Sequence, residues 1–103
     1  MSNQSVGQMY DPPHPGEFIA ETYLAPFGLS ARVLAGNLEV SPSTLTRVLN
    51  GSARVTPEMA LRLARVLGRS AESWLAMQDA HDLWRARARV DVERLTPVEF
   101  EVA

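Results

Sequence analysis

The sequence contains neither cysteine nor lysine, and no long apolar run. Without cysteine the chain forms no disulfide and no thiolate metal site, which suits a reducing compartment. No uninterrupted apolar segment approaches the roughly 20 residues that span a bilayer. The first residues also lack the basic segment and apolar core of a signal peptide. We therefore expect a cytoplasmic protein that does not bind a membrane.

Groups suited to catalysis are equally scarce. The chain has two histidines, His14 and His81. Asp79 and Asp82 flank His81, but neither lies three or four residues away on the same helical face, so no metal site or acid–base pair is indicated. Glycine-rich phosphate loops, nucleophile elbows and paired carboxylates are missing too. We predict no catalytic residue, no cofactor and no bound metal.

The charge is small but unevenly distributed. The formal net charge is −2, yet residues 29–69 carry six arginines against two glutamates, and residues 88–103 carry two arginines against four acids. This asymmetry predicts a DNA-facing segment and a separate segment for another partner. Arginine suits bidentate contacts to phosphate or guanine. The exclusive use of arginine is explained equally well by genome composition.

Residues 29–51, LSARVLAGNLEVSPSTLTRVLNG, carry the most informative pattern. Ser30 is placed to cap a helix from Ala31 to about Leu38. Ser41 caps a second helix, in which Pro42 takes the first position, where a missing N–H costs little. Asn50-Gly51 ends that helix. Two short helices joined by a tight turn predict a helix-turn-helix.

The outward face of the second helix lacks carboxylates. It carries short hydrogen-bonding side chains and one guanidinium, namely Ser43, Thr44, Thr46, Arg47 and Asn50. Such a face is typical of a surface that meets hydrogen-bond acceptors. The alternative is a solvated face on a small helical bundle.

Helical patterns also flank this segment. Pro15-Gly16 begins a helix that Pro26 and Gly28 end, Thr56-Pro57-Glu58 begins one that Gly68 ends, and Ser70 caps one that continues to about Arg87. At 103 residues the chain is one domain, or a small domain that completes its core by dimerising. We expect a flexible arm at 1–13, a DNA-binding domain with a dimerisation helix at 14–88 and a C-terminal tail at 89–103.

The last helix carries a stripe with the spacing of a helix–helix seam. Its members recur at intervals of three and four residues and are Trp74, Met77, His81, Trp84 and Ala88. We predict that this stripe forms a dimer interface. The alternative is that both tryptophans complete the domain core, and for Trp74 the core or a core–interface junction is favoured.

In the C-terminal tail the spacing of apolar residues changes from the helical repeat to alternation. Val98, Phe100 and Val102 alternate with Glu99 and Glu101, which suggests a β-strand. A single strand has to pair with its twin, fold back on the domain or add to a partner's sheet. The alternative is a disordered acidic tail.

Several segments together resemble one family. HPGEFI at 14–19, residues 29–51, VTPEMALRLARVLGRSAESWLAMQ at 55–78 and the following DLW are similar to the HigA-type, or VapI-like, antitoxins. The resemblance covers about residues 12–87. It implies an all-α, five-helix lambda-repressor-like fold. It also implies a dimer that represses its own operon and a RelE-like (HigB-type) toxin, an mRNA-cleaving ribonuclease, as partner. Relatives commonly carry Gln where this chain has Ala31 and Gly where it has Glu39.

The helix-turn-helix pattern assigns the contacts to DNA. Base contacts are predicted for Ser41, Ser43, Thr44, Thr46 and Arg47. Phosphate contacts are predicted for Ala31, Arg32, Asn50 and Arg54. A dimer would present two such helices to an inverted repeat in the operator. The alternatives are a stand-alone regulator without a toxin, and a protein-sequestering dimer scaffold with weak DNA binding.

Overall fold

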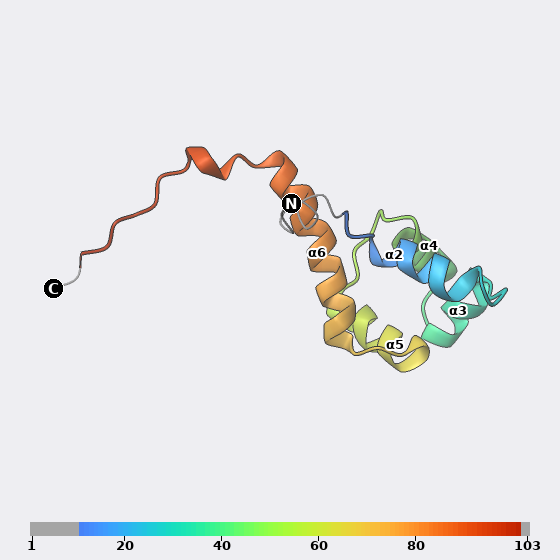
Figure 1. The fold of residues 1–103 in the computed structure, drawn as a ribbon. Coiled ribbons are helices and arrows are strands. Elements are labelled where there is room, and N and C mark those ends of the chain that lie inside the picture. Colours follow the sequence, from blue (N-terminus) through green and yellow to red (C-terminus); the bar gives the residue numbers. More distant parts are fainter. Residues whose placement is uncertain (1–10, 102–103) are drawn as a thin grey trace, which may run out of the picture.

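The computed structural model describes residues 11–101, and these form a helical domain with an extended tail (Figure 1). This confirms the all-α fold. The first ten residues of the predicted flexible arm lie outside the described range. Within that range, no helix is both long and apolar enough to cross a bilayer. The elements in chain order are α2 (Pro15–Ile19), η1 (Ala20–Leu24), α3 (Ala31–Leu38), α4 (Pro42–Leu49), α5 (Pro57–Leu67), α6 (Ala71–Arg89) and η2 (Val92–Arg94).

The predicted helix starts are confirmed by side-chain caps. The hydroxyl of Ser30 accepts a hydrogen bond from the N–H of Val33, and that of Ser41 accepts one from the N–H of Thr44, both at 3.1 Å. Thr56 and Ser70 cap α5 and α6 in the same way. Each cap satisfies a backbone donor that the helix itself leaves open, which fixes where the helix begins.

The first helix differs from the uniform helix that the sequence predicts. After Ile19 the backbone widens into the π-helical segment η1, with the N–H of Ala25 bonded to the carbonyl of Ala20. The wider turn brings side chains five residues apart towards one face. Phe18 and Tyr23 accordingly both pack edge-on or tilted against Trp74, with ring centroids 5.9 and 6.3 Å from it.

Trp74 lies in the core and is completely buried. Its indole N–H donates to the carbonyl of Gly68 at 2.9 Å, so its one polar atom is satisfied. Trp74 therefore offers no surface to a second chain and has to be removed from the predicted dimer interface. The other buried apolar residues are Ile19, Leu34, Ala35, Leu38, Leu45, Val48, Val55, Met59, Ala60 and Leu63.

α2 crosses α4 so closely that the crossing point has no room for a side chain. An ideal Cβ added to Gly16 would lie 1.9 Å from the carbonyl oxygen of Val48 and 2.7 Å from the Cα of Leu49. The position of α4 relative to the bundle therefore depends on a glycine at residue 16.

The tail leaves the bundle at the end of α6 and runs away from α3 (Figure 1). Apart from the short η2 turn it has no regular secondary structure, and within the described residues it forms no strand. The predicted strand over 98–102 is therefore not formed in the single chain, where no sheet edge offers its backbone a partner. Val102 lies outside the described residues.

Candidate nucleic-acid interface

α4 presents one polar face to solvent. Leu45 and Val48 point into the core, whereas Ser43, Thr46 and Arg47 are exposed. Thr44 is half-buried, and Ser41 and Asn50 are exposed at the two ends of the helix. The predicted base-contact residues thus lie on or beside one face of one helix, which is the geometry that reading base edges in a groove requires.

The hydroxyls at the start of α4 form a small network. Ser41 Oγ accepts from the Thr44 N–H and donates to Thr44 Oγ1 at 2.8 Å, and it lies 3.2 Å from Ser43 Oγ. The hydroxyl of Ser41 is therefore committed to capping the helix, whereas Thr44 Oγ1 only accepts and keeps its own proton to donate. Ser43, Thr46 and Arg47 are the side chains that remain directed outward.

The end of α4 is fixed by Asn50. Its Oδ1 accepts from the N–H of Ser52 at 3.0 Å and from the hydroxyl of Ser52 at 2.7 Å. The chain then turns through Gly51, whose φ is +83°. The amide NH2 of Asn50 keeps its two donors, so Asn50 can still contact a phosphate as predicted.

The remaining predicted phosphate contacts differ in availability. Arg32 is exposed on the first turn of α3, beside Ala31, whose backbone lies at the helix N-terminus. Arg54 instead turns towards α6, where its guanidinium is 2.9 Å from Asp82 Oδ2 and 3.5 Å from Asp79 Oδ1. Two carboxylates thus offset the charge of Arg54. No local pattern in the sequence indicates this contact, since both aspartates lie more than twenty residues after Arg54.

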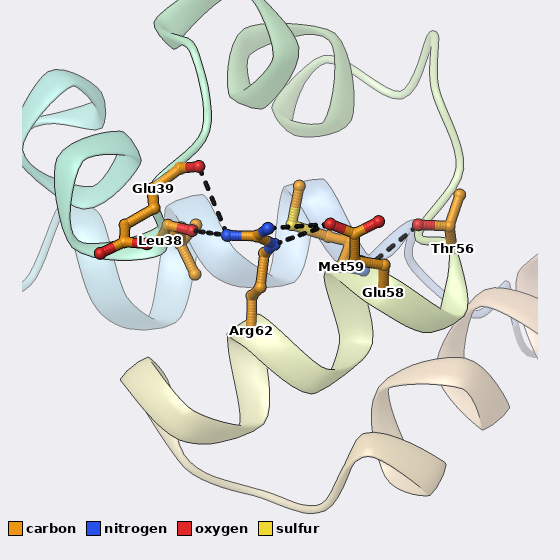
Figure 2. A network of polar contacts seen from close by, with 6 residues as sticks. All are labelled: Leu38, Glu39, Thr56, Glu58, Met59 and Arg62. Atoms are coloured by element: carbon orange, nitrogen blue, oxygen red, sulfur yellow. Dashed lines mark hydrogen bonds and ion pairs between the residues drawn. The ribbon is translucent and has the colours of Figure 1, made fainter.

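Arg62 ties the helix-turn-helix to α5, as Figure 2 shows. Its Nη1 donates to the carbonyls of Leu38 at 2.7 Å and Glu39 at 3.3 Å, and its Nη2 pairs with Glu58 at 2.8 Å. A guanidinium at a helix C-terminus stabilises carbonyls that have no helical partner. Arg62 is therefore a structural residue, although it adds to the positive count of residues 29–69.

We expect Arg62→Ala to lower the free energy of unfolding by about 1–2 kcal/mol, because charge-assisted bonds to two carbonyls are lost from a partly exposed site. Urea denaturation would measure this change. Arg65→Ala, an exposed arginine on the next turn of α5, is the matched control and should change stability by less than about 0.5 kcal/mol. Equal effects of the two substitutions would contradict the role assigned to Arg62.

The turn between α3 and α4 contains a strained residue. Glu39 has φ +60° and ψ +44°, in the left-handed region that favours glycine. Its side chain is exposed. The turn that leads to α4 therefore carries a carboxylate, on a residue whose backbone conformation is rare outside glycine.

Two histidines join the start of α2 to α6. His14 caps α2 by accepting from the N–H of Gly16 at 2.9 Å, and its ring meets that of His81 at 5.3 Å. His81 Nδ1 is 2.9 Å from the carbonyl oxygen of Pro12. Burial first, and then the neighbouring His81, lower the pKa of His14 below its usual value of 6.5, while Asp82 opposes that shift.

We expect stability to fall as the pH drops below about 6.5. Above that pH, His14 is neutral in both the folded and the unfolded chain. Below it, His14 takes up a proton in the unfolded chain but stays neutral in the folded chain, so protonation favours unfolding. The loss of stability ends once the pH falls below the lowered pKa of folded His14, where both forms are protonated. Urea denaturation between about pH 8 and pH 5 would measure the loss. His14→Asn keeps a capping side chain without titrating, so an undiminished pH dependence in this variant would contradict the assignment.

The known proteins that this chain resembles are helix-turn-helix proteins, among them an antitoxin. A family model described as a helix-turn-helix domain matches residues 19–74. Virulence-associated protein I of Dichelobacter nodosus is 50% identical over 70 residues, which cover 68% of this chain and 65% of that protein, slightly under two thirds. Antitoxin HigA-1 of Vibrio cholerae is 36% identical over 78 residues, 76% of this chain and 73% of that protein.

A solved structure extends the comparison to DNA. The antitoxin HigA of Pseudomonas aeruginosa, solved with the higBA promoter, superposes with a TM-score of 0.72 at 33% identity. The match covers 76% of this chain and 85% of that chain. The similarity therefore includes a protein whose structure holds promoter DNA.

Proposed function

Because this chain belongs to the HigA-type, VapI-like antitoxins of the helix-turn-helix family, we propose that it is the antitoxin of a type II toxin–antitoxin module. In this proposal it represses its own operon as a dimer and neutralises a RelE-like, HigB-type ribonuclease toxin. One observation carries the proposal: the exposed face of α4 combines Ser43, Thr46 and Arg47 without a carboxylate.

In the complex, α4 enters the major groove. Arg47 is exposed and forms no ion pair within residues 11–101, so its guanidinium is available for a bidentate contact to guanine. Thr46 can place its methyl group against thymine, and Ser43 can bond to either a base or a phosphate. Ser41 acts by holding the start of α4 in place, while Thr44 keeps a hydroxyl proton that it can donate to a base.

Phosphate contacts flank this helix. Arg32 and the backbone N–H groups at Ala31 lie at the N-terminus of α3, where the helix dipole favours an anion. Asn50 offers its amide at the other end of α4. Arg54 can reach a phosphate only by leaving Asp82 and Asp79, so we assign it a smaller contribution than Arg32.

Dimerisation uses the remaining members of the α6 stripe. Met77, His81 and Trp84 are half-buried, and Ala88 is exposed. His81, Trp84 and Ala88 line a groove of about 440 Å³ together with Pro12 and Pro13. To read successive major grooves, a dimer formed through this stripe has to set its two copies of α4 about 34 Å apart. The operator would then be an inverted repeat.

The deciding experiment compares binding to the chain's own upstream DNA with binding to a scrambled duplex, across a salt series. A strong preference for the upstream DNA, with two chains per site, would support the autorepressor. The proposal also requires that a RelE-like toxin be encoded beside the gene, and a catalytically inactive form of that toxin should bind the same dimer. Equal, weak and salt-sensitive binding to both DNAs would contradict sequence-specific repression and favour a protein-sequestering scaffold.

A further inference from the structure

Gln78 is a polar residue of α6 that lies inside the protein. It is 1% exposed, and both ends of its amide are bonded. Its Oε1 accepts from the N–H of Val55 at 2.7 Å, and its Nε2 donates to Asp82 Oδ1 at 3.1 Å. The other carboxylate oxygen of Asp82 pairs with Arg54 at 2.9 Å. A buried amide is costly unless it is hydrogen-bonded, so these bonds hold the Gln78 side chain in one orientation.

The loop after α4 connects Gln78 with the helix that carries Arg47. The N–H of Ala53 donates to the carbonyl of Arg47 at 3.0 Å, and the hydroxyl of Ser52 donates to the same carbonyl at 3.3 Å. Two residues after Ala53 the chain reaches Val55, which is buried and bonded to Gln78. The loop is therefore hydrogen-bonded to the last turn of α4 at one end and to α6 at the other.

α4 and α6 pack mainly on different neighbours. α4 lies against α2 and α3, whereas α6 lies mainly against α5. α2 contacts both helices, and the loop adds a link made of directed hydrogen bonds. A buried polar network in which each group has its partner specifies one arrangement more strictly than apolar packing does. The bonds of Gln78 are therefore suited to fix the orientation of α4 relative to α6.

This orientation matters for the operator that a dimer can read. In the proposed dimer the stripe on α6 forms the interface, and its member His81 lies three residues after Gln78. The two copies of α4 then have to lie about 34 Å apart. One base pair moves a half-site by about 3.4 Å. A small rotation of α4 in each subunit is thus enough to change the spacing that fits.

We propose that Gln78 is a positioning residue that sets α4 relative to the dimerising stripe of α6. In this way it determines the half-site spacing at which the protein recognises its operator. Gln78 itself touches no DNA, because it acts through Val55 and the loop on the helix of Arg47. This inference rests on the proposed function and adds a residue that controls its specificity.

The first test measures the affinity of the full chain for the inverted repeat in its own upstream DNA, and for duplexes whose centre is longer or shorter by one base pair. We expect the parent chain to prefer the native spacing by about tenfold or more, because a displaced half-site loses base contacts. Gln78→Met, which keeps a similar shape without the amide, should reduce this preference to about twofold or less. Leu63→Val is the matched control. It loosens the core in α5 outside the loop and should keep the preference.

A second variant restores the same bonds with reversed polarity. In Gln78→Glu/Asp82→Asn, a carboxylate at position 78 can accept from both Val55 and the new amide at position 82, so the spacing preference should return to within about twofold of the parent. Gln78→Glu alone sets two carboxylates against each other at about pH 8 and should lose the preference. This single variant replaces Gln78→Met if the latter does not fold.

The distance between the two copies of α4 can also be measured without DNA. Because the chain has no cysteine, Ser43→Cys attaches a single spin label to α4 in each subunit. We expect one narrow distance in the free dimer, and a broader distribution when Gln78→Met is added. The addition of Leu63→Val should leave the distribution narrow.

The contrary results separate this inference from the proposed function. An unchanged spacing preference in Gln78→Met would reduce Gln78 to a core residue and leave the proposed function intact. Equal losses in Gln78→Met and Leu63→Val, or a double variant that does not recover, would do the same. So would a parent dimer that binds every spacing equally well. A parent chain that does not prefer its upstream DNA to a scrambled duplex would remove the proposed repressor itself.

Discussion

Gly16→Ala is expected to lower the free energy of unfolding by about 3 kcal/mol and to abolish operator binding. The new methyl group would collide with the Val48 carbonyl and the Leu49 backbone, neither of which is a flexible side chain that could rotate away. α2 and α4 would have to separate, which shifts the helix that carries Arg47. Urea denaturation and a gel-shift titration on the upstream DNA would measure the two effects.

The chain supplies its own control for this prediction. Gly36 lies within α3, and a Cβ added there meets nothing within 4 Å. Gly36→Ala should therefore raise stability by roughly 0.5–1 kcal/mol, because alanine is the better helix former. It should leave DNA affinity nearly unchanged. If Gly16→Ala behaves like Gly36→Ala, the proposed tight crossing of α2 and α4 does not exist in solution.

Arg47→Ala is expected to abolish the preference for operator over scrambled DNA. A bidentate contact to guanine discriminates by about 1–3 kcal/mol, and a dimer makes it twice. Residual binding should resemble the affinity for the scrambled duplex. Fluorescence anisotropy with both DNAs, at two salt concentrations, would measure the loss.

Arg54→Ala is the matched comparison, an exposed arginine just beyond the same helix. It should weaken binding to both DNAs by a similar, small factor, because its guanidinium is already held by Asp82 and Asp79. Equal losses on operator and scrambled DNA for both variants would mean that Arg47 contacts only the backbone.

Much of the fold is predictable from local signals. The caps Ser30, Ser41 and Thr56 and the stop at Asn50-Gly51 place α3, α4 and the start of α5 correctly. Helical periodicity also separates the buried Leu45 and Val48 from the outward face of α4, so the candidate site follows from the order of the residues alone. Helix caps and the helical repeat of apolar residues depend only on residues a few positions apart, so they can be recognised in the sequence.

The features that the sequence does not predict depend on contacts between distant segments. Gln78 is buried and accepts from the N–H of Val55 at 2.7 Å, and Arg62 bonds to carbonyls more than twenty residues earlier. No spacing rule connects such pairs. The π-helical turn after Ile19 accompanies the packing of Phe18 and Tyr23 on Trp74, more than fifty residues later in the chain. The tail forms no strand among the described residues of the single chain, because alternation describes the two faces of a strand, whereas its formation needs a second strand to pair with.

The ion pairs of Arg54 and Arg62 reduce the number of arginines in residues 29–69 that are available to bind DNA phosphates. Each phosphate that a protein neutralises releases condensed cations and steepens the fall of affinity with salt by about 0.9 in logarithmic slope. Arg62 is already bonded to two carbonyls and to Glu58, so we expect it to contribute no phosphate contact. Arg54 would have to leave Asp82 and Asp79 to gain one. The operator complex should therefore tolerate rising ionic strength better than six arginines in residues 29–69 suggest. We therefore expect contacts to base edges in the groove, rather than electrostatic attraction to phosphates, to determine the site on DNA at which the protein stays bound.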